Sequence, residues 1–247
     1  MTTLVAAVRS LATYVAVASY VVLVGPPALL IAIARGRPLG LYRVADGGVR
    51  LGLWLSGMRI EVHHPEYILR DRAAVYAVNH TSNVEPPILY SVLGPLFPRL
   101  RILYKAELRK LPILVRAFDI AGFVPLERGN RDQSLPAIER AAEGLREGAS
   151  FLIFPEGTRS RTGELLPFKK GGFIMALKGQ APVVPVAITG ARDALQKGSF
   201  IIRPVRIVIR FGPPIETSGL GLPDRDALIT HARAAVASLL QQADQAA

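Results

Sequence analysis

The sequence contains no cysteine, which excludes disulfide bonds, thiolate metal sites and a cysteine nucleophile. It also lacks the GxSxG turn of a serine nucleophile, the P-loop that holds nucleotide phosphates, the GxGxxG turn of dinucleotide-binding folds and the HExxH pair of zinc enzymes. We therefore expect that any chemistry performed by this chain uses neither a metal ion nor a bound cofactor.

Acidic residues are few relative to basic ones. The 247 residues include 30 Lys and Arg but only 19 Asp and Glu, so the formal net charge is +11. A basic surface favours an anionic partner such as lipid headgroups, a phosphorylated substrate or nucleic acid. The aromatic residues lie in apolar runs rather than among the basic residues, and no nucleic-acid recognition motif occurs, so we expect no nucleic-acid partner. The alternative is a solvated basic surface without a partner.

Charge is absent altogether from residues 10–34, a run of 25 positions. As one straight helix this run would be about 37 Å long, enough to cross a hydrocarbon core of about 30 Å. Gly25-Pro26-Pro27 interrupts the run and predicts a kink or turn between a longer arm, residues 4–24, and a shorter one, residues 28–34. The alternative is a helix buried in a protein core.

An amphipathic stretch flanked by arginines follows the apolar run, so we predict that residues 1–60 form membrane-associated helices in contact with membrane lipids. A cleaved signal peptide fits poorly, because only Arg9 supplies positive charge at the start and the apolar region is long. If the run spans the bilayer, the arginine-rich flank after it favours a cytoplasmic location for the rest of the chain, at the inner membrane.

From Pro65 onward, short apolar runs alternate with longer helical segments. The predicted strands are residues 73–78, 101–105, 122–126, the start of 150–160, 183–188 and 205–211. The predicted helices are residues 86–93, 133–147, 172–178 and 224–242. This alternation predicts an α/β domain over residues 61–247, with a largely parallel central sheet flanked by helices. The polar motifs all follow predicted strands, at the sheet edge where ligands bind in such folds.

His80 and Glu85 lie in one such turn, in the segment NHTSNVEPP, residues 79–87. On a regular helix, residues five positions apart point about 140° away from each other, so the two side chains can meet only across a turn. A carboxylate that accepts from one imidazole nitrogen would leave the other free as a base for a substrate hydroxyl. The alternative is a polar helix start, with Ser82 or Asn83 as N-cap and Glu85 favoured by the helix dipole.

A second strand-end turn, FPEGTRSRTGELLPFKKGG at residues 154–172, is strongly basic. It carries four basic residues, which are Arg159, Arg161, Lys169 and Lys170. Arginine holds phosphate through two parallel hydrogen bonds, and a helix N-terminus adds backbone donors. The segment therefore predicts a phosphate site, against the alternative of a solvated basic loop. Lys105 and Arg128 follow other predicted strands and would converge on the same edge.

Four blocks, in order, resemble the glycerolipid acyltransferases of the 1-acylglycerol-3-phosphate acyltransferase type. They are NHTSNVE at residues 79–85, GFVPLERG at 122–129, FPEGTRS at 154–160 and VVPVAI at 183–188. The resemblance covers about residues 73–211, with the N-terminal helices as the expected membrane anchor. It implies transfer of a fatty acyl group from acyl-CoA or acyl carrier protein to the 2-hydroxyl of lysophosphatidic acid, which gives phosphatidic acid.

The resemblance also implies roles for particular residues. His80 would be the general base and Glu85 the carboxylate that orients it; the family's first block normally ends in aspartate, one methylene shorter. The acceptor's glycerol phosphate would be bound by Lys105, Arg128, Glu156, Gly157, Thr158 and Arg159. No acyl-enzyme is required, because the substrate hydroxyl itself attacks the thioester. Backbone N–H groups near the His80 turn are the candidate oxyanion donors.

Two alternatives stay open at this stage. The acceptor could be another lysolipid, such as a lyso-ornithine lipid or a lysophospholipid with a larger headgroup. The chain could also be a non-catalytic lipid-binding or membrane-scaffold protein on the same fold, although His80, Glu85 and Arg159 argue for an enzyme.

Overall fold

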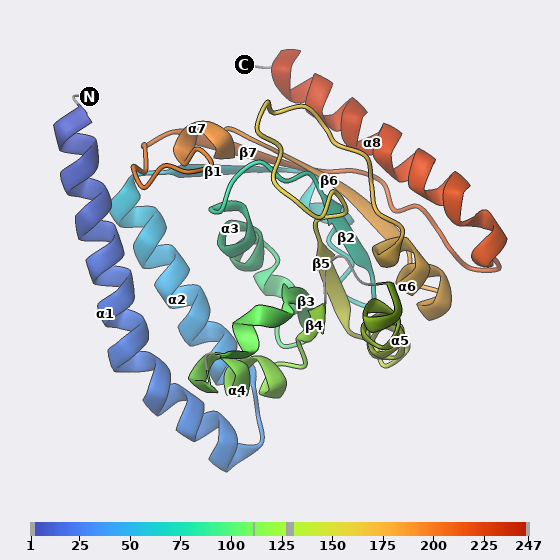
Figure 1. The fold of residues 1–247 in the computed structure, drawn as a ribbon, viewed down its shortest axis with the longest axis horizontal. Helices are drawn as coiled ribbons and strands as arrows, with labels where there is room; N and C mark the ends of the chain where they lie inside the picture. The colour runs from blue at the N-terminus through green and yellow to red at the C-terminus, as the bar shows by residue number, and fades with distance from the viewer. Residues whose placement is uncertain (1–2, 111, 127–130, 246–247) are drawn as a thin grey trace.

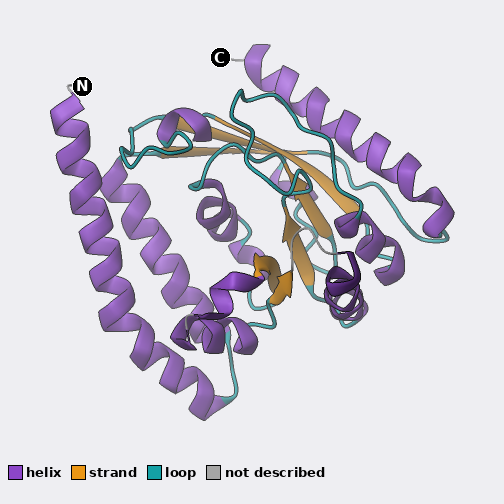
Figure 2. Cartoon of the chain, viewed as in Figure 1, coloured by secondary structure: helices purple, strands orange, loops and turns teal. Residues whose placement is uncertain are grey.

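The computed structural model describes residues 3–110, 112–126 and 131–245. Figures 1 and 2 show a central sheet with helices on both of its faces. The α-helices are α1 (Thr3–Arg35), α2 (Leu39–Ser56), α3 (Glu85–Val92), α4 (Pro112–Ile120), α5 (Arg131–Arg146), α6 (Gly171–Gly179), α7 (Ala191–Ala194) and α8 (Arg225–Gln245). The strands are β1 (Arg59–His63), β2 (Val75–Val78), β3 (Leu100–Lys105), β4 (Val124–Leu126), β5 (Ser150–Ile153), β6 (Val183–Thr189) and β7 (Arg206–Phe211).

The seven strands have the order β1-β7-β6-β2-β5-β3-β4. Five of them, from β6 to β4, are mutually parallel, whereas β7 is antiparallel to β6 and β1 is parallel to β7. The predicted α/β class with a largely parallel sheet is therefore confirmed. The carboxyl ends of the five parallel strands share one edge, and β2 lies inside this group, between β5 and β6.

Alternate residues of the central strands face two separate apolar cores. On β2, Tyr76 and Val78 belong to the core beneath α2 and α3, whereas Val75 and Ala77 belong to the core beneath α5, α6 and α8. Because both faces are covered, β2, β5 and all of β6 except Thr189 are fully buried. That burial explains why these strands are continuous apolar runs in the sequence instead of alternating polar and apolar residues.

Gly25-Pro26-Pro27 predicted a kink or a turn, and the turn is wrong for helix α1. It runs without interruption from Thr3 to Arg35 with both prolines inside, and Figure 1 shows that it bends rather than breaks. The φ angle that a proline ring imposes is close to that of a helix, so the prolines remove hydrogen bonds and curve the helix without forcing a turn. Helix α2 packs beside α1 along its length (Figure 1) and supports it.

Most of the apolar surface of α1 faces outward. Its most apolar 18-residue window, within Leu4–Arg35, has a mean hydropathy of 2.2, and only 11% of that window is buried. This exposure contradicts the alternative of a buried core helix. By length and composition, α1 is able to cross a membrane. Helix α2 is held to the core by Tyr42, whose buried hydroxyl donates to the carbonyl of Leu100 at 2.5 Å.

Candidate active site

Two turns meet at the carboxyl edge of the parallel strands. β2 leads into the turn that contains His80, and its neighbour β5 leads into residues 154–160. The backbone N–H of Ser160 donates to the carbonyl of His80 at 2.8 Å, so the two turns are hydrogen-bonded to each other. Two motifs that are far apart in the sequence thus form one site.

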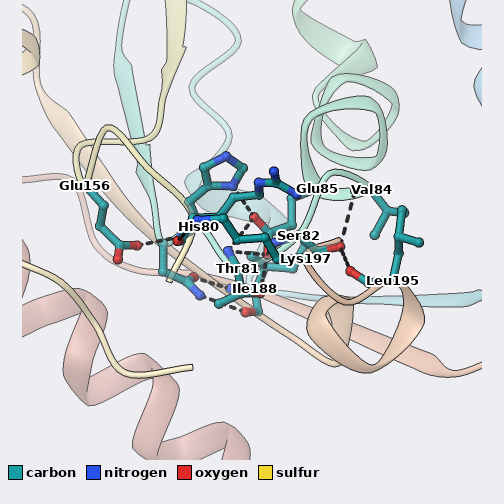
Figure 3. Close-up of polar contacts among 11 residues, drawn as sticks. His80, Thr81, Ser82, Val84, Glu85, Glu156, Ile188, Leu195 and Lys197 are labelled. Atoms are coloured by element: carbon teal, nitrogen blue, oxygen red, sulfur yellow. Dashed lines mark hydrogen bonds and ion pairs between the residues drawn. The ribbon is translucent and has the colours of Figure 1, made fainter. Parts of the chain in front are cut away.

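His80 and Glu85 are in direct contact. The Nδ1 atom of His80 lies 2.6 Å from Oε2 of Glu85 (Figure 3). The Glu85 side chain is completely buried, and the His80 side chain is 14% exposed. An ionised carboxylate only accepts hydrogen bonds, so the contact assigns the imidazole proton to Nδ1 and leaves Nε2 with a lone pair. The ring of Phe154 lies against the imidazole, with 4.3 Å between ring centroids, and restricts its rotation.

Every other contact of the Glu85 carboxylate is also with a donor. It accepts from the backbone N–H of Thr81 at 2.9 and 3.0 Å, from the hydroxyl of Thr81 at 2.6 Å and from the backbone N–H of Ser82 at 3.0 Å. A carboxylate surrounded only by donors suits the ionised form, because the acid form would have to donate as well. Burial of this charge is offset by those bonds.

The predicted helix cap is wrong. Helix α3 begins at Glu85 itself, with Val84 at the N-cap position and no side-chain cap. The hydroxyl of Ser82 instead donates to the carbonyl of Leu195 at 2.7 Å, and so ties the turn to the segment after β6. Glu85 bonds backbone groups that precede its helix rather than the first amides of the helix. Its geometry is therefore that of a partner for His80, not of a helix cap.

Glu156 holds the same turn from the other side (Figure 3). One of its oxygens accepts from the backbone N–H of His80 at 2.6 Å and the other from the backbone N–H of Leu166 at 2.9 Å. The residue is 3% exposed, and this burial raises the pKa of its carboxyl above the ordinary value. Sequence analysis placed Glu156 among the acceptor-binding residues, but the structure gives it a positioning contact with the backbone of His80.

The expected oxyanion donors in this turn are already engaged. The N–H groups of His80, Thr81 and Ser82 all donate to the carboxylates of Glu156 and Glu85. None of these three is left to stabilise negative charge on a substrate, so the prediction does not hold for them. The amides hold the turn in shape instead.

Asn79, which the sequence analysis did not single out, fixes the end of β2 against β6. Its side-chain amide donates to the carbonyl of Ile188 at 3.0 Å and accepts from the N–H of Ile188 at 2.8 Å. The side chain thus replaces a backbone ladder pair at the point where the chain turns away to place His80. Its position directly before His80 is the only hint that the sequence offers.

The predicted phosphate-binding residues occupy the same sheet edge. Arg159 is half-buried in the turn that is bonded to His80, and Thr158 beside it is exposed. Gly157 has a φ of +68°, in the left-handed region that side-chain-bearing residues rarely adopt, so the turn favours glycine there.

The other two predicted cations lie further along the sheet. Lys105 is exposed at the end of β3, with Glu107 at 2.8 Å. Since β3 is two strands from β2, its end lies roughly 10 Å from the His80 turn along the sheet. Arg128 lies outside the described residues.

Comparisons with known proteins agree on one family. The model of a family described as "Acyltransferase" matches residues 59–189. The chain is 34% identical over 178 residues to a 1-acyl-sn-glycerol-3-phosphate acyltransferase of Limnanthes douglasii, an alignment that covers 72% of this chain and 61% of that protein. It is 28% identical to the protein of the same name from Borreliella burgdorferi, over 78% of this chain and 76% of the relative.

The fold is similar to the crystal structure of the 1-acyl-sn-glycerophosphate (LPA) acyltransferase PlsC from Thermotoga maritima. The TM-score is 0.82 at 25% sequence identity, and the match covers 99% of this chain and 98% of the other. The chain thus matches that structure over its whole length, whereas it spans only about three fifths of the first plant relatives.

Proposed function

Because this chain belongs to the acyltransferase family, we propose that it transfers a fatty acyl group from a thioester to the sn-2 hydroxyl of 1-acyl-sn-glycerol 3-phosphate. The products are phosphatidic acid and a free thiol. The observation that carries this proposal is the 2.6 Å contact between His80 and the buried Glu85, which leaves Nε2 free to take a proton. The names of the relatives at 34% and 28% identity support the choice of acceptor.

The reaction needs one general base and no covalent enzyme intermediate. Nε2 of His80 removes the proton of the acceptor hydroxyl while its oxygen attacks the thioester carbonyl. The tetrahedral intermediate then collapses, the carbon–sulfur bond breaks, and the thiolate takes the proton from the imidazolium. The acyl group is now an ester of the acceptor, and His80 returns to its starting state.

Glu85 keeps His80 in the productive form. Its charge stabilises the imidazolium that forms during the attack, and its contact with Nδ1 prevents the ring from presenting a protonated nitrogen to the hydroxyl. A positioned general base typically contributes a factor of about 10² to 10⁴ in rate. Glu156 contributes indirectly, because its bond to the N–H of His80 sets the direction of the turn.

The acceptor phosphate is bound, in this proposal, by cations of the same edge. Arg159 is the central one, because its turn is bonded to His80 through Ser160. A charge-assisted contact with phosphate contributes about 1.5–3 kcal/mol. Lys105 and Arg128 add charge from the strands further along, and Gly157 and Thr158 shape the turn.

The acceptor is a membrane lipid, and the exposed apolar face of α1 would keep the enzyme at the bilayer that contains it. We propose that residues 1–60 attach the protein to the inner membrane and that residues 61–247 carry out the transfer on its cytoplasmic side. Arg35 at the end of α1 and Arg37 just after it are exposed and suit contact with anionic headgroups.

The proposal is tested with purified protein, acyl-CoA or acyl carrier protein as donor, and a panel of lysolipids. We expect thiol release and a diacyl product, identified by mass, with lysophosphatidic acid but not with acceptors that lack the phosphate. His80→Ala should abolish release. Transfer to a lyso-ornithine lipid in preference to lysophosphatidic acid would replace the proposed acceptor, and absence of transfer to every acceptor would favour a lipid-binding protein.

A further inference from the structure

A pocket of about 270 Å³ opens directly beside the catalytic turn, on its β6 side. Thr81, which follows His80 in the sequence, is one of its lining residues. The remaining lining comes from the loop after β5 and from α7 with the loop that follows it, namely Ser160, Arg161, Arg192, Gln196 and Lys197. Neither Arg159 nor Lys105 is among its lining residues, although Arg159 directly precedes Ser160.

Three cations and no carboxylate line this pocket. Arg161, Arg192 and Lys197 are exposed, and within the described part of the chain no ion pair joins any of them to an acid. Nζ of Lys197 donates to the carbonyl of Arg159 at 3.2 Å, which connects the loop after α7 to the loop after β5. Gln196 and the hydroxyl of Ser160 add neutral polar groups, whereas the hydroxyl of Thr81 already donates to Glu85. Such a set of donors suits an anion rich in oxygen.

The two substrates of an acyl transfer must reach His80 from different directions. The acceptor is assigned to cations that follow β5, β3 and β4, whereas Arg192 and Lys197 follow β6, on the other side of β2. Basic residues thus lie on both sides of the His80 turn, and the third cation of the pocket, Arg161, belongs to the same β5 loop as Arg159. One acceptor phosphate contacts only part of this basic surface.

We infer that the β6-side pocket binds the phosphate of the pantetheine arm of the acyl donor, an inference that rests on the proposed function. This phosphate is present in both thioester carriers, coenzyme A and acyl carrier protein. The volume of about 270 Å³ is slightly below the usual range for small-molecule pockets, about 300–1,000 Å³, and suits a phosphate with its adjoining atoms rather than a whole nucleotide.

The test compares two donors that differ only in this phosphate, acyl-4′-phosphopantetheine and acyl-pantetheine. Wild-type protein should use the phosphorylated donor with a kcat/KM at least about tenfold higher, the usual effect of a charged hydrogen bond. Arg192→Ala combined with Lys197→Ala should reduce this preference to less than about threefold, with little change in the KM for lysophosphatidic acid. Arg203→Ala, an exposed arginine outside the pocket lining, is the matched control and should keep the preference.

Each other result overturns the inference in a distinct way. A preserved donor preference in the double variant removes the pocket from donor binding. A rise in the KM for lysophosphatidic acid instead assigns the pocket to the acceptor phosphate. If the double variant loses activity with acyl carrier protein as donor but not with acyl-CoA or acyl-4′-phosphopantetheine, the pocket serves to dock the carrier protein.

Calorimetry with 4′-phosphopantetheine alone separates this inference from the proposed function, because it does not depend on turnover. Wild-type protein should bind the compound at least about tenfold more tightly than the double variant, again from the loss of charged hydrogen bonds. Equal binding overturns the inference even where transfer is observed. If the wild type binds 4′-phosphopantetheine more tightly than the double variant but transfers no acyl group, the pocket inference stands and the acyltransferase proposal is wrong.

Discussion

Replacement of Glu85 by glutamine tests the catalytic pair with a single atom change. In the structure, Oε1 accepts from three donors and Oε2 from His80 Nδ1 at 2.6 Å and from the N–H of Thr81 at 3.0 Å. Because three donors point at the Oε1 position, the amide oxygen of glutamine is expected there, and its NH₂ group then faces His80. Nδ1 must then accept, so the imidazole proton moves to Nε2, and Nε2 can no longer remove a proton from the hydroxyl.

The expected loss follows from this change of tautomer. General-base assistance contributes a factor of about 10² to 10⁴, so we expect kcat to fall at least about 10²-fold in Glu85→Gln. The corresponding substitution in the serine-protease triad is a worked example in general accounts of catalysis and lowers kcat by about 10⁴. Glu85→Asp keeps the charge but is shorter by one carbon–carbon bond, about 1.5 Å, and should retain more activity than Glu85→Gln.

The assay is thiol release at saturating lysophosphatidic acid, with the melting temperature as a check on folding. Glu143→Gln, at an exposed position of α5, is the matched control and should behave as wild type. His80→Ala should be at least as severe as Glu85→Gln, and the double variant no worse than His80→Ala, because the two residues act as one unit. A fall in kcat of less than about threefold in folded Glu85→Gln would refute the assigned role.

Three further predictions concern the surroundings of the pair. Arg159→Ala should raise the KM for lysophosphatidic acid about 10- to 150-fold, which corresponds to 1.5–3 kcal/mol, and initial rates will show it. Val22→Lys with Leu23→Lys, on the exposed face of α1, should shift the protein out of the membrane fraction, since lysine inserts about 3 kcal/mol less favourably than these residues. Because burial raises the pKa of Glu156, wild-type protein loses stability as the pH rises through that pKa, and Glu156→Gln does not. The melting temperature of the wild type, minus that of the variant, should therefore be larger at about pH 4 than at about pH 7.

Each of these has a control and a contrary outcome. Arg116→Ala, an exposed arginine of α4, should leave the acceptor KM unchanged, and an equal effect of both substitutions would remove Arg159 from the phosphate site. Leu222→Lys, exposed far from α1 in the sequence, should not alter membrane attachment; full retention of the α1 variant would show that other surfaces hold the protein. A melting-temperature difference that is constant with pH would show that Glu156 does not titrate as its burial implies.

Local sequence patterns were sufficient for the buried strands and for the family. The apolar runs at residues 73–78 and 183–188 predicted β2 and β6, because strands covered on both faces contain few polar residues. The edge strand β1 was missed, because RIEVH contains charged residues and none of its residues is fully buried. The continuity of α1 through its prolines could not be predicted from the sequence alone, since it also depends on packing with α2.

The part of the candidate site whose residues are close in the sequence could be predicted. His80 and Glu85 lie five residues apart, so one turn brings them together. The contact of Glu156 with the N–H of His80 spans 76 positions, and only the pairing of β2 with β5 creates it. The same limit applies to the oxyanion donors, because no sequence pattern shows that the N–H of His80 is already occupied by the distant carboxylate of Glu156.

The compactness of the His80–Glu85 pair has a consequence for motion. The base, its acid and the amides of Thr81 and Ser82 that hold the acid all belong to a single six-residue segment. A shift of the surrounding loops therefore carries base and acid together and leaves the distance between them unchanged. What such a shift alters is the direction in which Nε2 points, through the bonds to Glu156 and Ser160. Substitutions in those outer residues should consequently change how substrates are aligned with the base.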